Sequence, residues 1–207
     1  MKNANPSPRP RGRPRGFDRD AALAIAMETF WRLGYEGASI ADLTAAMGIT
    51  PQSLYAAFGS KAELYRETLA LYRVSSGASF PTMLAEAPSV SAAFERLLAE
   101  RAHTFTRTGL PAGCMISAAV LTCASENAPI ADHLRELRLG GFASFRGGLE
   151  RGKQSGEFRA DLDVGGLARF LGAIIQGMAV QARDGASEAD LVGLARMASE
   201  ELARWRA

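Results

Sequence analysis

Closely spaced helix start and stop signals between residues 17 and 75 constrain the fold more than any other feature of this sequence. Each predicted helix after the first begins at a Ser or Thr that can accept a hydrogen bond from the first turn, and glycines end the helices. The predicted caps are Ser39, Thr50 and Ser60, and the glycines are Gly34 and Gly48. The segment therefore predicts four helices within about sixty residues, three short ones and the start of a longer one.

The rest of the chain also reads as helix. Apolar residues recur at three- and four-residue spacing, prolines fall in or next to the gaps, and no stretch shows the alternation of a strand. The predicted helices are 61–75, 89–108, 113–126, 129–154, 163–183 and 187–206. We predict an all-α chain with a basic arm (1–16), a small helical domain (17–75) and a larger helical domain (76–207).

The two short helices joined by "MGI" form a predicted helix-turn-helix, in which the second helix enters the DNA major groove. Their expected core residues are Ile40, Leu43, Ala46, Ile49, Leu54 and Phe58, packed on Phe30. The front of the second helix keeps Thr50, Pro51, Gln52, Ser53 and Tyr55. Gln can pair with adenine, hydroxyl groups can bind phosphate, and proline can contact a thymine methyl.

Lys61 opens the next helix, where free backbone N–H groups already favour an anion, so it is a predicted phosphate contact. Helix-turn-helix shapes also occur as plain packing units, which leaves a structural subdomain as the alternative at this point.

Residues 17–72 resemble the N-terminal domain of the TetR/AcrR family of bacterial transcriptional regulators. The matching marks are Phe30 with Gly34 and Tyr35, then "SIADL", "MGI", "SLY" and "FGSKAEL". The resemblance implies an all-α homodimer that binds a palindromic DNA operator, usually as a repressor, and releases it when a small molecule enters the larger domain. Ser39 is then a further expected DNA contact. Gln52 and Ala57 depart from the family pattern, so we expect Gln52 to make an operator contact of its own.

The N-terminal arm is the most basic part of the chain. Residues 1–19 hold six basic residues and Asp18 alone, a net charge of +5; the chain carries +2, which leaves −3 for the remainder. A basic tail on an acidic body usually has a polyanionic partner. "GRPRG" resembles arginine arms that enter the minor groove, so Arg13 and Arg15 are predicted DNA contacts.

Stripes of small and apolar residues follow the last two predicted helices. They are Ala168, Gly172, Ile175 and Ala179 on the first, and Leu191, Leu194, Ala198, Leu202 and Trp205 on the second. Such faces pack either within one chain or across a two-fold axis. The resemblance implies pairing through these helices, so we take the residues as the predicted dimer interface.

An unknown small-molecule effector is expected among the helices between 61 and 183. The candidate pocket residues are Phe94, Leu97, Arg101, Phe105, Cys114, Met115, Ala118, Phe142, Phe145, Ile174 and Met178. Most are apolar, which favours a hydrophobic effector, although such residues also build ordinary cores.

Cys114 lies near the start of the predicted helix 113–126, where a helix dipole lowers a thiol pKa. It is either a sensor of oxidants and electrophiles or a buried small apolar residue. Glycines at 140, 141, 147 and 148 mark either close packing or a helix that bends.

Several function classes find no support. The two histidines lie far apart and no HExxH, GxSxG or nucleotide-binding glycine motif is present, so we predict no catalytic residues, no metal site and no cofactor. No run of 18 apolar residues predicts a membrane span, and two cysteines with no apolar leader indicate a reducing cytoplasm. The alternatives kept open are an architectural, chromosome-organising DNA-binding protein and a thiol- or metal-sensing repressor.

Overall fold

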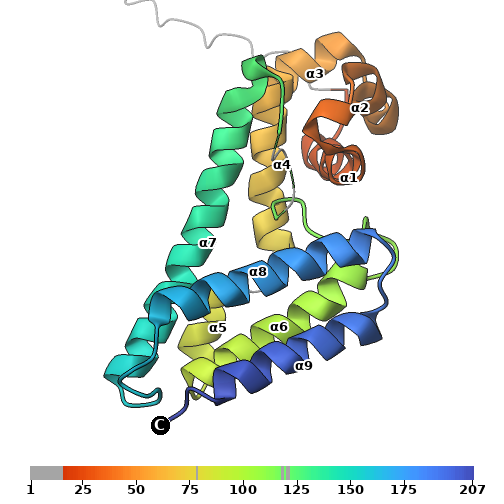
Figure 1. Cartoon of the computed structure of the whole chain (residues 1–207). Helices are drawn as coiled ribbons and strands as arrows, with labels where there is room; N and C mark the ends of the chain where they lie inside the picture. The colour runs from red at the N-terminus through yellow and green to blue at the C-terminus, as the bar shows by residue number, and fades with distance from the viewer. Residues whose placement is uncertain (1–15, 78, 118, 120–121) are drawn as a thin grey trace, which may run out of the picture.

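The computed structural model describes residues 16–77, 79–117, 119 and 122–207 (Figure 1). Arg13, Arg15 and Ala118 lie outside these residues. The described chain is all-α, which confirms the predicted fold class, and its only extended pairing is an isolated bridge between Phe158 and Arg206. The elements are α1 (Arg19–Gly37), α2 (Ile40–Met47), α3 (Pro51–Phe58), α4 (Lys61–Ser75), α5 (Phe80–Glu86), α6 (Val90–Thr106), η1 (Ser125–Asn127), α7 (Ala128–Gln154), α8 (Val164–Arg183) and α9 (Glu188–Ala203).

The N-terminal helices pack against the first part of α4 around an aromatic centre. The Phe30 ring meets the Tyr65 ring of α4 edge to face, with 4.8 Å between ring centroids. The Tyr35 ring centroid lies 5.0 Å from that of Tyr65. The helical backbone of α1 breaks at Gly34, where φ is 76°, and this turn sends Tyr35 back into the core. Without a Cβ, glycine adopts this left-handed conformation at little cost.

The caps that join α2, α3 and α4 form as the sequence predicts. Ser39 and Asp42 make a reciprocal capping box, Thr50 accepts from the Ser53 N–H, and Ser60 accepts from the Glu63 N–H. One core prediction is wrong, because Ala46 is exposed. Its neighbour Met47 is buried instead.

A second core forms where α6 packs between α8 and α9, with α5 and the end of α7 closing one side (Figure 1). Phe80, Phe94 and Phe145 form its aromatic centre, with ring centroids 4.3 to 5.6 Å apart. Figure 1 shows α4 and α7 as the long helices that run between this layer and the small domain. α7 carries side chains of both cores, whereas the apolar side chains of α4 belong to the N-terminal core.

The sequence analysis predicts no helix at α5, because it takes Pro81 to mark a gap between helices. Proline is tolerated in the first turn of a helix, where its missing N–H costs nothing, and Ser79 caps α5 one residue before Phe80.

The predicted helix 113–126 is wrong. Between Arg107 and Ala124 no described residue is helical, and Gly113 has a left-handed φ of 79°. Carbonyls that a helix would satisfy internally instead accept hydrogen bonds from Arg138, at Ile116 and Ala119. Cys114 therefore lies in a loop and not at a helix N-terminus, so the helix-dipole argument for its thiol does not hold.

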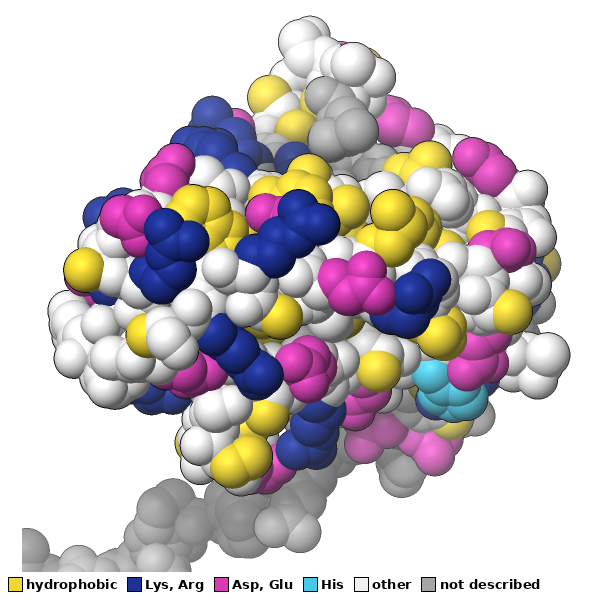
Figure 2. Space-filling view, turned by 60° about the horizontal axis from the view of Figure 1, so that its bottom comes forward, with side chains coloured by type: hydrophobic (Ala, Val, Ile, Leu, Met, Phe, Trp, Pro, Cys, Tyr) yellow, Lys and Arg dark blue, Asp and Glu magenta, His cyan; other side chains and the backbone are white. Residues whose placement is uncertain are grey.

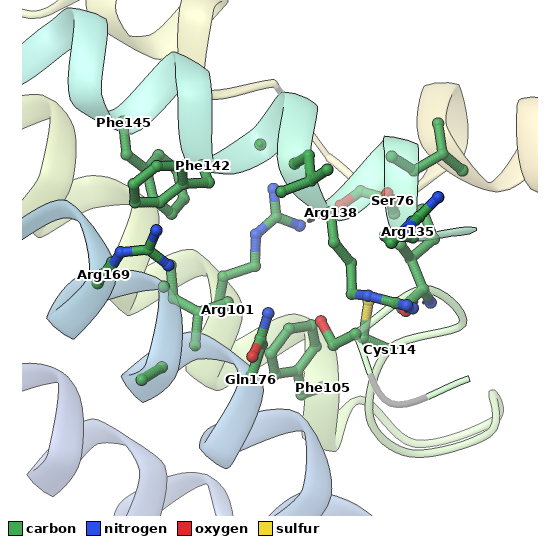
Figure 3. Close-up of a pocket in the computed structure, with 18 of the residues that line it drawn as sticks. Ser76, Arg101, Phe105, Cys114, Arg135, Arg138, Phe142, Phe145, Arg169 and Gln176 are labelled. Atoms are coloured by element: carbon green, nitrogen blue, oxygen red, sulfur yellow. Dashed lines mark hydrogen bonds between the residues drawn. The ribbon is translucent and has the colours of Figure 1, made fainter. Parts of the chain in front are cut away.

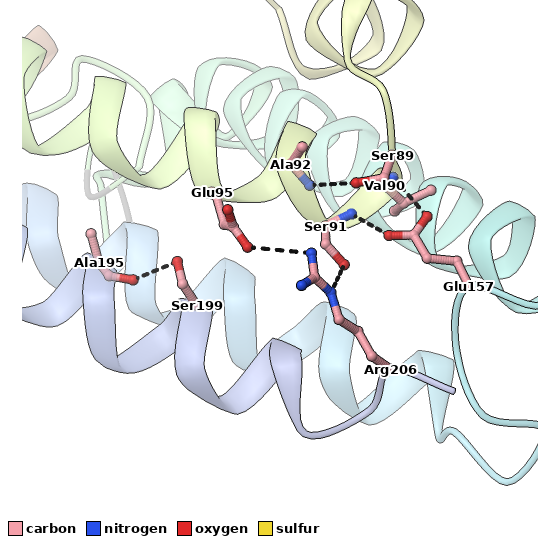
Figure 4. Close-up of polar contacts among 9 residues, drawn as sticks. All are labelled: Ser89, Val90, Ser91, Ala92, Glu95, Glu157, Ala195, Ser199 and Arg206. Carbon is pink, nitrogen blue, oxygen red and sulfur yellow. Dashed lines mark hydrogen bonds and ion pairs between the residues drawn. The ribbon is translucent and has the colours of Figure 1, made fainter.

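The C-terminus is fixed to the second core by a polar cluster (Figure 4). The Glu157 carboxylate accepts hydrogen bonds from the Val90 and Ser91 N–H groups at the start of α6, both at 2.8 Å. Arg206 donates to the Ser91 hydroxyl at 3.2 Å and lies 3.7 Å from Glu95. Burial alone would raise the pKa of Glu157, but these hydrogen bonds and the Arg206 charge lower it overall.

Among the described helices, α8 is long and apolar enough to cross a membrane by length and composition. It packs against α6, α7 and α9, which accounts for much of its apolar character as a core helix. Its remaining exposed apolar residues, Phe170 and Val180, lie on the outer surface.

Two adjacent glycines of α7 give the first prediction. A Cβ on Gly147 would meet no atom within 4 Å, whereas a Cβ on Gly148 would lie 3.0 Å from the Phe80 ring. We expect Gly147→Ala to stabilise the protein by up to ~1 kcal/mol through helix propensity. Gly148→Ala should be less stable than wild type because Phe80 must move. Urea unfolding midpoints test this, and equal shifts for both variants would contradict it.

The second prediction concerns Glu157 and pH. Its folded pKa lies below the ordinary value of 4.5, so its contribution is present above that value and is lost as pH falls through the folded pKa. We expect Glu157→Gln to lower the unfolding free energy by about 1–3 kcal/mol at pH 7, the usual range for a hydrogen-bonded charge. The difference from wild type should shrink below about pH 4.5. The exposed Glu136→Gln serves as the control in urea titrations; a deficit independent of pH would refute the charge-based account.

Candidate DNA-binding interface and effector pocket

The front of α3 presents an exposed polar surface. Leu54 and Phe58 turn into the core, whereas Pro51, Gln52 and Tyr55 are exposed, the last with 47% of its surface accessible. Neither Gln52 nor the Tyr55 hydroxyl makes a hydrogen bond to another described residue. A helix anchored by one face with free donors and acceptors on the other has the geometry of a recognition helix.

The predicted hydroxyl contacts have structural roles already. Thr50 caps α3 and donates to the Ser53 hydroxyl at 3.0 Å. Ser39 donates to Asp42 at 2.6 Å within the capping box. A hydroxyl oxygen can accept as well as donate, so these groups hold the front of each helix in shape while staying at the surface.

Lys61 lies at the N-terminus of α4 with its ammonium 4.6 Å from the centre of the Tyr35 ring. Burial lowers the pKa of Lys61, and the charge of Glu36 offsets part of this effect. Tyr35 therefore holds the lysine beside the first turn of α4, where the helix dipole adds positive potential.

The arm enters the described structure next to α3. Gly16 and Phe17 line one side of a shallow groove of about 300 Å³, and Ile49, Thr50, Ser53 and Ala57 line the other. Gly16, the first described residue, therefore lies on the same surface as the front of α3.

A cavity of about 630 Å³ lies between the ends of α4 and α6, the middle of α7 and α8, and the loop 107–124 (Figure 3). Arg135, Leu139 and Gln176 are among its exposed lining residues. The buried Phe105 and the half-buried Phe142 and Phe145 give it apolar walls. The further lining residues are Tyr72, Ser76, Arg101, Cys114, Ile116, Ser117, Leu137, Arg138, Gly141, Arg169, Gly172, Ala173 and Ile175.

The cavity contains part of the predicted pocket set. Arg101, Phe105, Cys114, Phe142 and Phe145 line it. The other predicted pocket residues lie elsewhere: Phe94, Leu97 and Met178 are buried in the second core, Met115 is buried in the N-terminal core, and Ile174 lines a groove between α8 and α9.

The sequence analysis predicts Arg101 but misses the other three arginines of this cavity, Arg135, Arg138 and Arg169. Arg135, Arg138, Phe142 and Phe145 follow one face of α7 at three- and four-residue spacing, and Arg169 of α8 lies over the Phe142 ring at 4.8 Å. This spacing of arginine and phenylalanine on one helix face is visible in the sequence, but a pattern of apolar residues alone does not include the arginines. The lining is therefore more polar than the expected hydrophobic pocket.

The loop after α6 connects this cavity to the DNA-binding domain. Its Cys114, Ile116 and Ser117 line the cavity, while Met115 between them is 2% exposed within the N-terminal core. Farther along, the Glu36 carboxylate of α1 accepts from the Ala124 N–H at 3.3 Å and the Asn127 amide at 2.8 Å.

Two further contacts tie the large domain to α1. Arg183 of α8 donates to the carbonyls of Trp31 and Arg32, both at 3.3 Å. Tyr72 packs edge to face on Trp31 at 4.9 Å; burial raises its pKa, with smaller contributions from its neighbour Cys114. Side chains at or near the cavity are thus in direct contact with the N-terminal domain.

Most of the predicted dimer stripe needs correction, with Leu194 and Trp205 as the exceptions. The side chains of Ala168, Ala179, Leu191, Ala198 and Leu202 are buried against α6 and each other within one chain. Gly172 and Ile175 line the cavity, and Leu194 and Trp205 line the α8–α9 groove. The exposed apolar surface is the neighbouring face of the same helices, with Phe170 and Met197 at 38% and 62% exposure.

No group of three or more His, Cys, Asp or Glu side chains within the described residues could hold a metal ion. His103 pairs with Glu188 at 3.1 Å, and Cys114 and Cys123 are both free thiols.

Comparison with known proteins identifies the family. Residues 22–68 match the model of bacterial regulatory proteins of the tetR family, and residues 92–194 match the tetracyclin repressor-like C-terminal domain. The chain belongs to the TetR family. It is a DNA-binding transcriptional regulator and not an enzyme, as the resemblance of its N-terminal residues predicted.

Named relatives of the chain are transcriptional regulators of the same family. The chain is 39% identical over 186 residues to the HTH-type transcriptional repressor ComR of Escherichia coli K12, with 89% of each chain covered. The HTH-type transcriptional repressor BdcR of the same organism is 29% identical over 194 residues, with 92% of each chain covered. Among solved structures, a cysteine mutant of the TetR family regulator CifR, complexed with 26-bp double-strand operator DNA, is 42% identical. It has a TM-score of 0.87, and the match covers 91% of this chain and 98% of CifR.

Proposed function

We propose that this regulator is a homodimeric, ligand-responsive repressor that binds a palindromic operator and releases it when a small molecule fills the cavity. The observation that carries the proposal is the exposed front of α3, whose Gln52 and Tyr55 have no partner among the described residues. CifR, which shares this fold at 42% identity, was solved on operator DNA, and ComR and BdcR are named repressors.

In this proposal each DNA contact has a separate role. Gln52 and Pro51 face base edges, whereas Tyr55, Lys61 and the capping hydroxyls of Ser39, Thr50 and Ser53 face phosphates. Arg13 and Arg15 reach the minor groove from the surface where Gly16 begins.

The second subunit is expected on the outer face of α8 and α9. Phe170, Ile174, Leu194 and Met197 form an apolar groove rimmed by charged Asp163, Glu200, Glu201 and Arg204. Figure 2, which turns this end of the molecule toward the viewer, shows apolar side chains exposed between charged ones. An apolar centre with a charged rim suits an interface between copies. Pairing there would set two recognition helices about 34–36 Å apart, one turn of DNA.

The loop 107–127 supplies the route from ligand to DNA. A ligand that occupies the cavity contacts Cys114, Ile116 and Ser117, and a shift of these residues moves Met115 within the N-terminal core. The contacts of Glu36 with Ala124 and Asn127 would change as well. Because both α1 and α4 pack on this loop, its displacement would change the spacing of the two reading heads.

We propose a cytoplasmic location, because a DNA-binding regulator needs access to the chromosome. An architectural role remains the second candidate, since the basic arm would also bind DNA without sequence preference. The deciding experiment selects bound fragments from the source genome with purified protein and footprints them at two salt concentrations. A short protected palindrome supports the proposal, whereas scattered binding that disappears with salt would replace it with the architectural role.

Gln52 and Lys61 give the third prediction. Gln52→Ala should relax preference at one base position by about 1–3 kcal/mol, because it removes a base contact only. Lys61→Ala should weaken binding to all DNA alike and lower the salt slope by about one, because it removes a phosphate contact. Fluorescence anisotropy with the operator and single-base variants, at several salt concentrations, separates the two effects. An unchanged base preference in Gln52→Ala would show that Gln52 reads no base.

Met197 gives the fourth prediction. Met197→Glu places a charge in the centre of the proposed interface, and we expect the variant to be monomeric and to lose operator affinity at least tenfold. Val74→Glu, at a position 80% exposed and outside this face, is the matched control and should remain dimeric. Sedimentation equilibrium measures both. A dimeric Met197→Glu would place the interface elsewhere.

A further inference from the structure

The cavity has an unusual charge for a site with apolar walls. Arg101, Arg135, Arg138 and Arg169 line it, and no Asp or Glu stands among the described lining residues. Arg101 donates to the Ser76 carbonyl at 3.0 Å. Asp132 pairs with Arg135 at 3.0 Å, at the mouth of the cavity.

Two of these arginines have no carboxylate partner in the described part of the chain. Arg138 donates only to the carbonyls of Ile116 and Ala119, both at 3.2 Å, and burial lowers its pKa. Arg169 lies over the Phe142 ring. Arg169 is exposed, whereas Arg138 is half-buried. A half-buried guanidinium that lacks a counter-charge is costly, and an anion bound beside Arg138 would relieve that cost.

The apolar groups lie next to the charged ones. Figure 3 shows the Arg101 side chain between Phe142 and Phe145 at one end of the cavity and Arg138 and Cys114 at the other. Arginine's planar fork matches carboxylate and sulfonate oxygens, while the three phenylalanines offer flat surfaces to an aromatic body. The volume of about 630 Å³ is in the usual range for small-molecule sites.

From this juxtaposition we infer that the effector is an aromatic organic anion, with its acid group on Arg138 and its ring system against Phe105, Phe142 and Phe145. The inference rests on the proposed ligand-responsive function and specifies the ligand class. It also explains how the ligand acts: an acid group on Arg138 competes with the Ile116 and Ala119 carbonyls, which frees the loop that carries Met115.

Two fluorescent dyes that differ by one acid group test the ligand class. 1-Anilinonaphthalene-8-sulfonate is an anion, and N-phenyl-1-naphthylamine is the same body without the sulfonate. We expect the full-length protein to bind the anion at least tenfold more tightly. In Arg138→Gln and in Arg169→Gln this ratio should fall at least threefold. Arg146→Gln, on an exposed part of α7 outside the cavity, should keep the wild-type ratio.

Three outcomes would overturn the inference: no binding of either dye, equal binding of both, or a ratio that neither cavity variant changes. Arg138→Gln could lower dye binding simply by loosening the loop. Arg169→Gln controls for this effect, because Arg169 makes no contact with that loop among its described interactions. Operator binding is measured on the same samples. Operator release by a neutral ligand alone would refute the anionic class and keep the proposed function. Dye discrimination with unchanged operator affinity would keep the anionic site and refute ligand-controlled release.

Discussion

The hydrogen bonds from Arg138 to the Ile116 and Ala119 carbonyls are the interaction on which this account depends. They hold residues 107–124 as a loop where the sequence pattern suggests a helix. The loop can then place Cys114 and Ile116 in the cavity and Met115 in the N-terminal core. One side chain of α7 thus shapes the cavity and braces the contact between the two domains. Removing it would take a hydrogen-bond donor from two part-buried carbonyls and would loosen the loop.

In the DNA-binding domain, structural side chains and exposed polar side chains are different residues, whereas in the cavity one residue can do both. In the domain, capping groups and the Lys61–Tyr35 contact fix the helices, which leaves Gln52 and Tyr55 exposed for the proposed DNA contacts. In the cavity, Phe142 both packs under Arg169 and forms the wall that an aromatic ligand would meet. A cation over an aromatic ring thus serves structure at one end of the molecule and, in the proposed ligand site, would serve recognition at the other.

The sequence predicted the small domain well because its helices are bounded by local signals. Ser39, Thr50 and Ser60 cap helices within a few residues of their own position. It failed where long-range contacts decide: Arg138 replaces the internal hydrogen bonds of the predicted helix 113–126, and α6 covers the small residues of α8 and α9 that seemed free for a partner. Four of the eleven predicted pocket residues, Phe94, Leu97, Met115 and Met178, belong to the cores for the same reason. Periodicity gives the buried face of a helix and not what covers it.

Hydrogen–deuterium exchange of the dimer with and without its selected operator tests the central claim most directly. Coupling between sites is reciprocal, so a loop that transmits ligand binding to DNA must also respond to DNA. The account predicts that operator binding changes exchange at residues 107–127 and at the start of α7, as well as in α1–α3. Changes confined to residues 16–75 would show that the loop does not couple the cavity to the DNA-binding surface.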